Sequence, residues 1–358
     1  MRAMSSRNGI RRGNGPLADA RRWSVAMALL ALGCPSLRDT VNANPGLRWW
    51  LFTNFGAPQI CPHVLDSSVP LRSSPGNTQG RFFPKTCRYE VDGQRHTIRL
   101  HFAGTGYSWF PVAGRVGFEA SAGVEYRMDF QMAEEAMYLW ASPSSVTEGP
   151  DFQLASVENP LVDWASRNPG AFLAQAFGGE LMSSRLGEGF TVIHTDQGNE
   201  FALGHLSPPA RPARPFDTSG SRRFVFFNET TEIRANQVDF IGPLEVPRAG
   251  QALYFRFRVQ GPAVDAALFT RQAADTWRES VQRGLPLSAP LQAPVASWTI
   301  PASIDSPQRV TAAPGKYVLV IDNGSTLGAV APPWNPLASV GGSAAVVSFT
   351  AEVGDANP

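Results

Sequence analysis

Apolar residues alternate with polar ones along much of the chain, with the period of two that predicts half-buried β-strands. In the first half this pattern covers residues 97–102, 116–122, 124–130, 137–141, 152–157, 190–194 and 201–205. Asp92-Gly93 separates the runs 88–91 and 94–102, and this dipeptide is typical of a type I′ hairpin turn. The pattern therefore predicts a mostly antiparallel sheet in this half of the chain.

Helical periodicity is restricted to short segments. Asn44-Pro45 predicts the start of a helix, as N-cap and first helical residue, and Gly56 predicts its end. The residues expected on its apolar face are Leu47, Trp50, Leu51 and Phe55. That face either packs on the core of the first domain, or the aromatic residues of the helix contact a membrane interface, a zone that Trp favours. The aromatic residues in the second interpretation are Trp49, Trp50 and Phe52.

Two further helix starts are predicted at Asn159-Pro160 and Asn168-Pro169, and Gly178-Gly179 ends the second helix. Helices over a curved sheet can close a hydrophobic cavity, as they do in lipid-carrying folds, or they can simply cover one face of the sheet. The sequence leaves both arrangements open.

The second half is also rich in strands, and a proline-rich segment separates it from the first. Ser207–Pro215 holds four prolines in nine residues, which predicts an extended, semi-rigid linker. Strands are predicted at 238–240, 248–259, 264–270, 313–322 and 344–353. We therefore expect a mainly β protein with two domains, an antiparallel sheet with short helices over 34–206 and a jelly-roll-like β-sandwich over 216–354.

Residues 236–353 resemble the bacterial pre-peptidase C-terminal domain, a small β-sandwich, and more distantly the GOLD-type sandwich. The residues that carry the resemblance are Val238-Asp239-Phe240, Ala249-Gly250-Gln251 before a long strand, and Ala313-Pro314-Gly315-Lys316-Tyr317 before a late one. The resemblance implies an accessory domain of a secreted enzyme or surface protein. The first domain resembles no family that we recognise.

The N-terminal segment indicates where the protein is located. An apolar run of 11 residues, Trp23–Gly33, follows Arg21-Arg22 and ends in Ala31-Leu32-Gly33-Cys34. The run is too short to span a bilayer and has the length of a signal-peptide core. Its end resembles the lipobox of bacterial lipoproteins, although Ala31 stands where that family prefers Leu, Val or Ile. An ordinary secretory signal is the alternative.

The lipobox resemblance implies that residues 1–33 are a signal peptide and that Cys34 carries lipid, including palmitate or a similar acyl chain. Pro35 follows the cysteine, so the Asp that retains some lipoproteins at the inner membrane is absent. We therefore expect a protein anchored in the outer membrane. After Cys34 no apolar run approaches the length of a membrane-spanning helix.

Net charge argues against nucleic acid as a partner. Residues 1–33 hold six of the 31 basic and one of the 30 acidic side chains, so 25 basic and 29 acidic remain, a net charge of −4. Nucleic-acid binding needs clustered cations, and a mildly acidic chain does not supply them.

Three cysteines fit an envelope protein. With Cys34 assigned to lipid, Cys61 and Cys87 are left, and an even pair in an oxidising compartment predicts a disulfide. Two buried free thiols are the alternative.

No motif of nucleophilic, phosphate-binding or metal-dependent catalysis is present. Of the five histidines, His96 and His101 are expected on opposite faces of one strand, whereas His101 and His205 could meet across the sheet if their strands pair; packing or surface positions are the alternative. We predict no catalytic residue, metal or cofactor. Aromatic residues near expected loops are the candidates for ligand binding, with core packing as the alternative: Tyr107, Trp109, Trp277, Trp298 and Trp334.

The expected function is that of an envelope-anchored lipoprotein that binds or scaffolds without catalysis, with a lipid, a glycan or a protein as ligand. A secreted or surface hydrolase with an accessory sandwich and a subunit of an envelope-assembly complex are the two alternatives.

Overall fold

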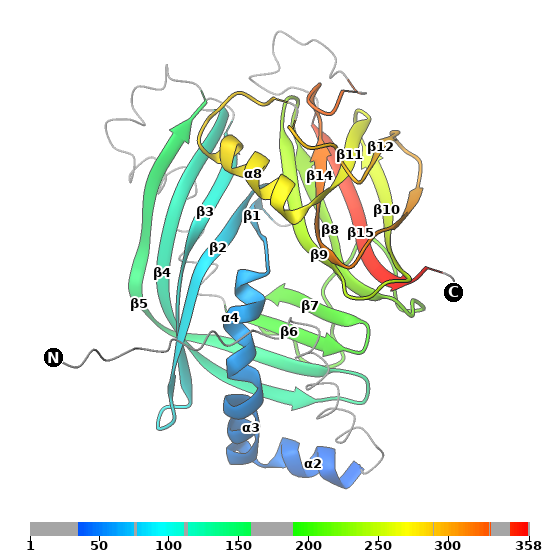
Figure 1. Ribbon diagram of the computed structural model, residues 1–358. Helices are drawn as coiled ribbons and strands as arrows, with labels where there is room; N and C mark the ends of the chain where they lie inside the picture. The colour runs from blue at the N-terminus through cyan, green and yellow to red at the C-terminus, as the bar shows by residue number, and fades with distance from the viewer. Residues whose placement is uncertain are drawn as a thin grey trace, which may run out of the picture.

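The computed structural model describes residues 35–74, 77–110, 114–158, 189–288, 290–328, 330 and 344–356 (Figure 1). Its architecture is mainly β with a few short helices, which confirms the predicted fold class. The signal segment, Cys34, the predicted helices at 160–178 and Trp334 lie outside the described residues.

Among the described residues, seven strands form the sheet of the first half. They follow one another in sequence order and pair antiparallel throughout. Their bounds are β1 (Val69–Ser74), β2 (Asn77–Asp92), β3 (Thr97–Phe110), β4 (Gly114–Met132), β5 (Met137–Val157), β6 (Phe190–Thr195) and β7 (Gly198–Leu203). β4 and β5 are each one long strand, although the alternation in the sequence predicted two shorter segments for each.

The β2–β3 hairpin forms where Asp92-Gly93 predicted it, but its turn is longer than a two-residue type I′ turn. Asp92 pairs with Thr97, so four residues, 93–96, make the turn. The Asp92 carboxylate accepts hydrogen bonds from the backbone N–H groups of Gln94 and Arg95, at 2.9 and 3.0 Å, and these bonds stabilise the longer loop.

Gly104 lies inside β3 and not in a turn or loop. A Cβ at Gly104 would stand 2.2 Å from the backbone oxygen of Phe83 on β2. Glycine is needed here because two backbones approach closely, and the strand continues through Tyr107 and Trp109.

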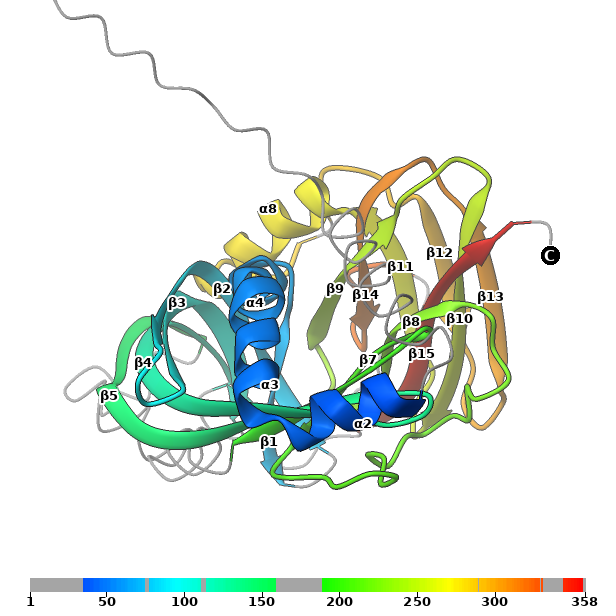
Figure 2. The same cartoon turned by 90° about the horizontal axis from the view of Figure 1, so that it is seen from below.

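Helices at the start of the described chain cover one face of this sheet. They are α2 (Pro35–Ala43), α3 (Pro45–Leu51), the π-helical turn η1 (Phe52–Gly56) and α4 (Ala57–Leu65). Figure 2 shows the sheet curving around α3 and α4. Asn44 caps α3 as predicted, with its side chain accepting from the Leu47 N–H at 3.0 Å. Gly56 does not end the helix, because the chain continues through the π turn into α4.

The second half is a β-sandwich, as predicted. One layer, in the order β8-β15-β10-β13, continues the first sheet; the other has the order β12-β11-β14-β9. The strand bounds are β8 (Phe224–Ile233), β9 (Val238–Val246), β10 (Gln251–Gln260), β11 (Val264–Thr270), β12 (Ala296–Ile300), β13 (Ser306–Thr311), β14 (Gly315–Asp322) and β15 (Ala345–Asp355). The alternating residues Leu253, Phe255, Phe257 and Val259 are all buried between the layers.

The two halves share a hydrophobic core. The helix α8 (Arg271–Gln282), which the sequence did not predict, lies between them (Figure 1). The first half contributes Phe83, Tyr107 and Trp109, and the second half contributes Val238, Phe240, Phe269, Trp277, Val281, Val318 and Val320. The halves are therefore packed as one body, while the domain bounds remain a prediction. None of the helices in the described part of the chain has the length and apolar character needed to cross a bilayer.

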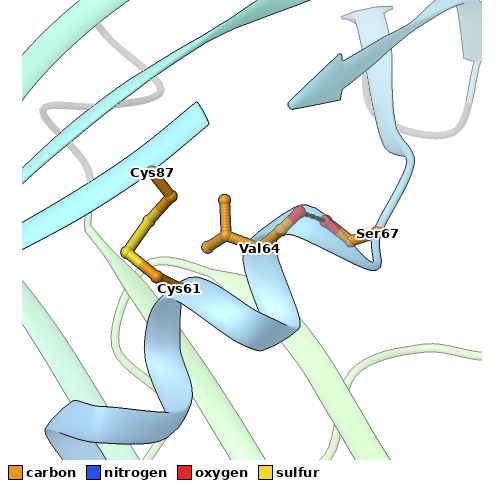
Figure 3. The surroundings of a disulfide bond; sticks show 4 residues. All are labelled: Cys61, Val64, Ser67 and Cys87. Atoms are coloured by element: carbon orange, nitrogen blue, oxygen red, sulfur yellow. Dashed lines mark hydrogen bonds between the residues drawn. A yellow bond between two sulfur atoms is a disulfide. The ribbon is translucent and has the colours of Figure 1, made fainter. Parts of the chain in front are cut away.

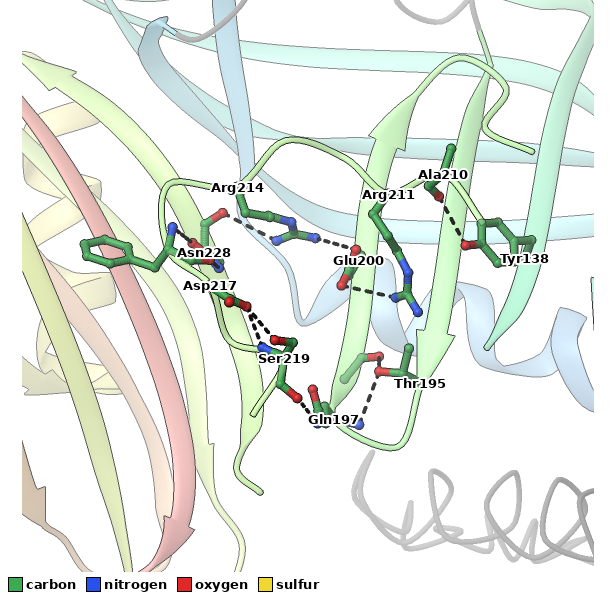
Figure 4. A network of polar contacts seen from close by, with 12 residues as sticks. Tyr138, Thr195, Gln197, Glu200, Ala210, Arg211, Arg214, Asp217, Ser219 and Asn228 are labelled. Atoms are coloured by element: carbon green, nitrogen blue, oxygen red, sulfur yellow. Dashed lines mark hydrogen bonds and ion pairs between the residues drawn. The ribbon is translucent and has the colours of Figure 1, made fainter. Parts of the chain in front are cut away.

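The linker at 207–215 is bound along its length (Figure 4). Arg211 and Arg214 reach Glu200 on β7 at 3.3 and 3.7 Å. Tyr138 on β5 donates its hydroxyl to the Ala210 carbonyl at 3.1 Å, and Arg214 also donates to the Asn228 carbonyl at 3.4 Å. These contacts attach the proline-rich segment to both halves.

Candidate functional site

The predicted disulfide forms between Cys61 on α4 and Cys87 on β2, and their Cα atoms lie 5.3 Å apart (Figure 3). The Ser67 hydroxyl donates to the Val64 carbonyl at 2.7 Å where α4 ends. The disulfide ties α4 to the sheet beneath it. α4 is the last helix of the N-terminal layer, which consists of α2, α3, η1 and α4.

Polar contacts fix the first helices of that layer as well. Asn42 on α2 and Met132 on β4 exchange two hydrogen bonds, each 2.9 Å long. Arg48 on α3 forms a bidentate ion pair with Asp129, with Nε–Oδ1 and Nη2–Oδ2 distances of 2.7 and 3.1 Å. The buried side chains beneath the layer include Val41, Phe52 and Ala57. The segment that directly follows Cys34 is thus held against the sheet by covalent, polar and apolar contacts.

The aromatic residues of this layer divide into two groups. Trp49 and Phe52 pack toward the sheet, and the Trp49 ring also stacks on His96 at 4.9 Å. Trp50 and Phe55 point outward, with 53% and 42% of their surface exposed. The sequence predicted that Leu47, Trp50, Leu51 and Phe55 form one apolar face. That prediction is wrong for Trp50 and Phe55, which point away from the core that Leu47 and Leu51 contact.

The four predicted ligand-binding aromatics that the structure describes lie in the core or pack against it. Tyr107 and Trp109 are buried on β3, and Trp277 is buried on α8 against Phe240 and Phe269. Trp298 lies on β12 and packs on Phe255 and Phe257 inside the sandwich. Trp277 and Trp298 are thus on regular elements, not in loops. The structure does not bring these residues together as one exposed site.

A buried polar network crosses the junction of the two halves. Arg81 on β2 contacts Asp239 on β9 at 2.8 Å and Glu229 on β8 at 2.5 Å. Tyr107 donates its hydroxyl to Asp239 at 2.8 Å, and Thr231 donates to the same carboxylate at 2.9 Å. Burial alone would lower the pKa of Arg81, but the two carboxylates outweigh it and raise that pKa. Burial and the charge of Asp239 raise the pKa of Tyr107.

A second buried pair consists of two carboxylates. Asp265 on β11 and Asp322 on β14 are directly opposite in the strand register. Thr299 and the Val330 N–H donate to Asp265, at 2.9 and 2.8 Å, and the Leu327 N–H donates to Asp322 at 2.9 Å. Burial first, and then the charge of Asp265, raise the pKa of Asp322 to about 6.

Two surface hollows are lined mainly by polar side chains. One, of about 420 Å³, holds Arg127, Asp129, Gln131, Trp140, Ser142, His205 and Ser207. There His205 stacks on Trp140 at 4.7 Å, and the Trp140 indole N–H donates to the Leu206 carbonyl at 2.8 Å. The other, of about 480 Å³, lies along the outer face of α8 between Arg271 and Glu279.

The histidines have separate partners. His101 is 3.1 Å from the Glu148 carboxylate at the sheet surface, His194 is 2.5 Å from the Asn199 side chain, and His205 stacks on Trp140. His101 and His205, which the sequence allowed to meet, are therefore engaged elsewhere. Over the described residues, no three His, Cys, Asp or Glu side chains form a group that could hold a metal ion.

Sequence reasoning missed both buried carboxylate clusters. In the sequence, Asp239 contributes only to the Val238-Asp239-Phe240 motif of the sandwich resemblance. A single acidic residue inside an apolar strand segment is the signal that could have identified it, because such a charge is rarely buried without a partner.

No protein-family model and no curated protein sequence matches this chain. Among solved structures, it is weakly similar to a glycoside hydrolase family 43 arabinoxylan arabinofuranohydrolase from Bacillus subtilis in complex with cellotetraose. That match has a TM-score of 0.21 and 7% identity, and covers 74% of this chain and 66% of that one. The secreted serine protease VesC from Vibrio cholerae matches with a TM-score of 0.19 and 8% identity, over 84% of this chain and 53% of that one. The chain spans less than two thirds of either protein, and likeness this weak carries no argument about fold or activity.

Proposed function

We propose that this protein is a lipoprotein of the bacterial cell envelope, anchored through acyl chains on Cys34, and that it acts as a non-enzymatic binding or scaffolding protein. The basic segment, the short apolar run and the small residues before Cys34 support the anchor. The disulfide of Cys61 and Cys87 supports export, because such bonds persist in oxidising compartments. Pro35 supports sorting to the outer membrane.

One observation carries the scaffolding role: the helical layer that begins at Pro35 is fixed to the sheet. Asn42, Arg48 and Cys61 attach successive helices of this layer to β4 and β2. The shared core then joins that sheet to the sandwich. An acyl anchor on Cys34 would hold the entire β body near the membrane, without a long flexible tether between them. A rigid body held in this way suits presentation of a fixed surface to a lipid, glycan or protein ligand.

Metabolic labelling with an alkyne analogue of palmitate tests the anchor in the native host. We expect label on the wild type and on Cys61→Ala, and none on Cys34→Ala. Cys61→Ala is the matched control because it removes a different thiol. Absence of label from the wild type, or equal label on Cys34→Ala, contradicts the proposal.

A further inference from the structure

Trp50 and Phe55 form an exposed aromatic pair on the N-terminal layer. Their ring centroids are 5.9 Å apart and the rings meet edge to face at 76°. They expose 53% and 42% of their surface, in a molecule that buries most of its other described aromatic side chains. Leu37, on α2 between Cys34 and this pair, is 38% exposed.

The π turn aligns these two residues. In an α-helix residues four apart share a face, and five apart they diverge. The Ala57 N–H donates to the Phe52 carbonyl, a bond across five residues, so η1 holds one residue more than an α-helical turn. Trp50 and Phe55, five residues apart, therefore lie together on the exposed side of the helix. Phe52 and Ala57, also five apart, lie together on the buried side. The same irregularity that keeps the inner face in register brings the two outer aromatics together.

The location of the pair indicates what covers it. Only α2 separates Cys34 from α3, and its nine residues span about 14 Å at 1.5 Å per residue. Tryptophan favours the interface between water and hydrocarbon, where its ring is accommodated and its N–H stays hydrated. A leaflet that holds acyl chains on Cys34 would lie within reach of Trp50.

Arg38 and Arg48, the arginines of α2 and α3, already have acidic partners, so a membrane contact of the Trp50 and Phe55 face would be apolar. Arg48 is paired with Asp129 at 2.7 Å, and Arg38 lies 3.4 Å from Asp39 and 3.9 Å from Glu134. Attraction to anionic headgroups depends on unpaired basic residues. These arginines give the face little net positive charge, and a zwitterionic bilayer suffices.

We propose that Trp50 and Phe55, with Leu37, form a membrane-contact face that lies in the interfacial zone of the leaflet anchoring Cys34. This inference rests on the proposed lipoprotein function and adds a second contact with the same membrane. Amphipathic helical surfaces beside a lipid anchor bind bilayers in this way, with aromatic and aliphatic side chains at the boundary between headgroups and acyl chains. The contact would orient the β body relative to the membrane.

Fluorescence quenching tests the contact directly. The purified acylated protein is placed in phosphatidylcholine vesicles whose acyl chains carry bromine close to the headgroup, and tryptophan emission is compared with unbrominated vesicles. Membrane fractionation cannot serve as the readout, because the acyl chains hold the protein with or without the face. We expect quenching in the wild type, loss of most of it in Trp50→Phe, and no loss in Trp298→Phe, whose ring packs inside the sandwich.

Placing the tryptophan at another position provides the matched control. In the Trp50→Phe background, Phe55→Trp should restore quenching, whereas Phe201→Trp should not, although Phe201 on β7 is 57% exposed. Unchanged quenching in Trp50→Phe, or restoration at Phe201 but not at Phe55, overturns the membrane-contact face.

The outcome for the anchor is separate. If the protein is acylated but its quenching does not depend on Trp50, the proposed function stands and the inferred membrane-contact face is wrong. Trp50-dependent quenching of a protein that mass spectrometry shows to be unacylated supports the membrane contact, and it overturns the anchor.

Discussion

Arg81 and Asp239 form a buried ion pair of 2.8 Å across the junction of the two halves, although 158 residues separate them in the chain. Tyr107 joins the pair from the neighbouring strand, because it is the cross-strand partner of Arg81. The hydroxyl of Tyr107 also accepts the Phe240 N–H at 2.9 Å. Strands β2 and β3 are thereby connected to β9 through charge and hydrogen bonds inside the shared core.

Removing the cation should leave a buried carboxylate without its main partner. For Arg81→Met we expect the free energy of unfolding to fall by about 3–5 kcal/mol in chemical denaturation, as when one member of a buried pair is lost. Arg256→Ala is the control, because it breaks an exposed pair with Asp305 and should change stability little. Similar losses in both variants would contradict the assigned role of the buried pair.

Asp322 should make stability depend on pH in the opposite sense to a salt-bridged carboxylate. Its pKa is raised to about 6 in the folded state, above the ordinary 3.8. Stabilisation from its protonated form is complete below the unfolded pKa and is lost as pH rises through the folded pKa. From about pH 4 to pH 7 the wild type should lose up to about 3 kcal/mol through this group.

Asp322→Asn separates that contribution from those of other groups. Asn is neutral at every pH and keeps an oxygen to accept the Leu327 N–H. The difference in unfolding free energy between variant and wild type should therefore grow in favour of the variant from pH 4 to pH 7. A difference that stays constant with pH would show that Asp322 does not titrate in this range.

Gly117 on β4 tests the packing of α8 against the sheet. A Cβ there would stand 1.8 Å from the backbone oxygen of Gln282, at the end of α8. We expect Gly117→Ala to lower the free energy of unfolding by at least about 1–3 kcal/mol, the usual cost of overpacking. Gly93→Ala is the matched control, since a Cβ at Gly93 meets no atom within 4 Å. Equal stability of both variants would mean that α8 does not approach β4 so closely.

The disulfide should contribute measurably to stability. It joins residues 26 positions apart, and loop entropy assigns roughly 3–4 kcal/mol to a loop of this length. Cys61→Ser/Cys87→Ser should therefore unfold at lower denaturant concentration than the oxidised wild type, and a reductant should shift the wild type only. If the wild type does not respond to reductant while both thiols become accessible to a labelling reagent, the stabilising role is wrong.

Strand positions were predictable because side chains alternate with a period of two wherever one face of a sheet is buried. Leu253 to Val259 and Ile98 to Phe102 follow that rule, and the hairpin at Asp92-Gly93 and the cap at Asn44 follow local backbone chemistry. Each of these features depends on neighbours within a few residues.

Features that depend on a distant or irregular contact were not predictable. The π turn adds one residue between Leu51 and Phe55, so a regular 3.6-residue period wrongly placed Phe55 on the core face with Leu51. Pro58, which has no N–H and crowds the preceding turn, is a local signal of that irregularity. Gly104 resembles a turn residue until β2 is known to pack against it. Arg81 and Tyr107, two partners of Asp239, are more than a hundred residues away in the chain, whereas Thr231 on β8 is near it in sequence.

Intact mass and membrane fractionation of the native protein, compared with Cys34→Ala, test the central claim most directly. The account predicts a wild-type chain that begins at Cys34, carries acyl mass and sediments with membranes, and a variant without acyl mass that moves to the soluble fraction. A wild type that is unacylated and soluble would contradict the anchor and remove the main support for an envelope scaffold.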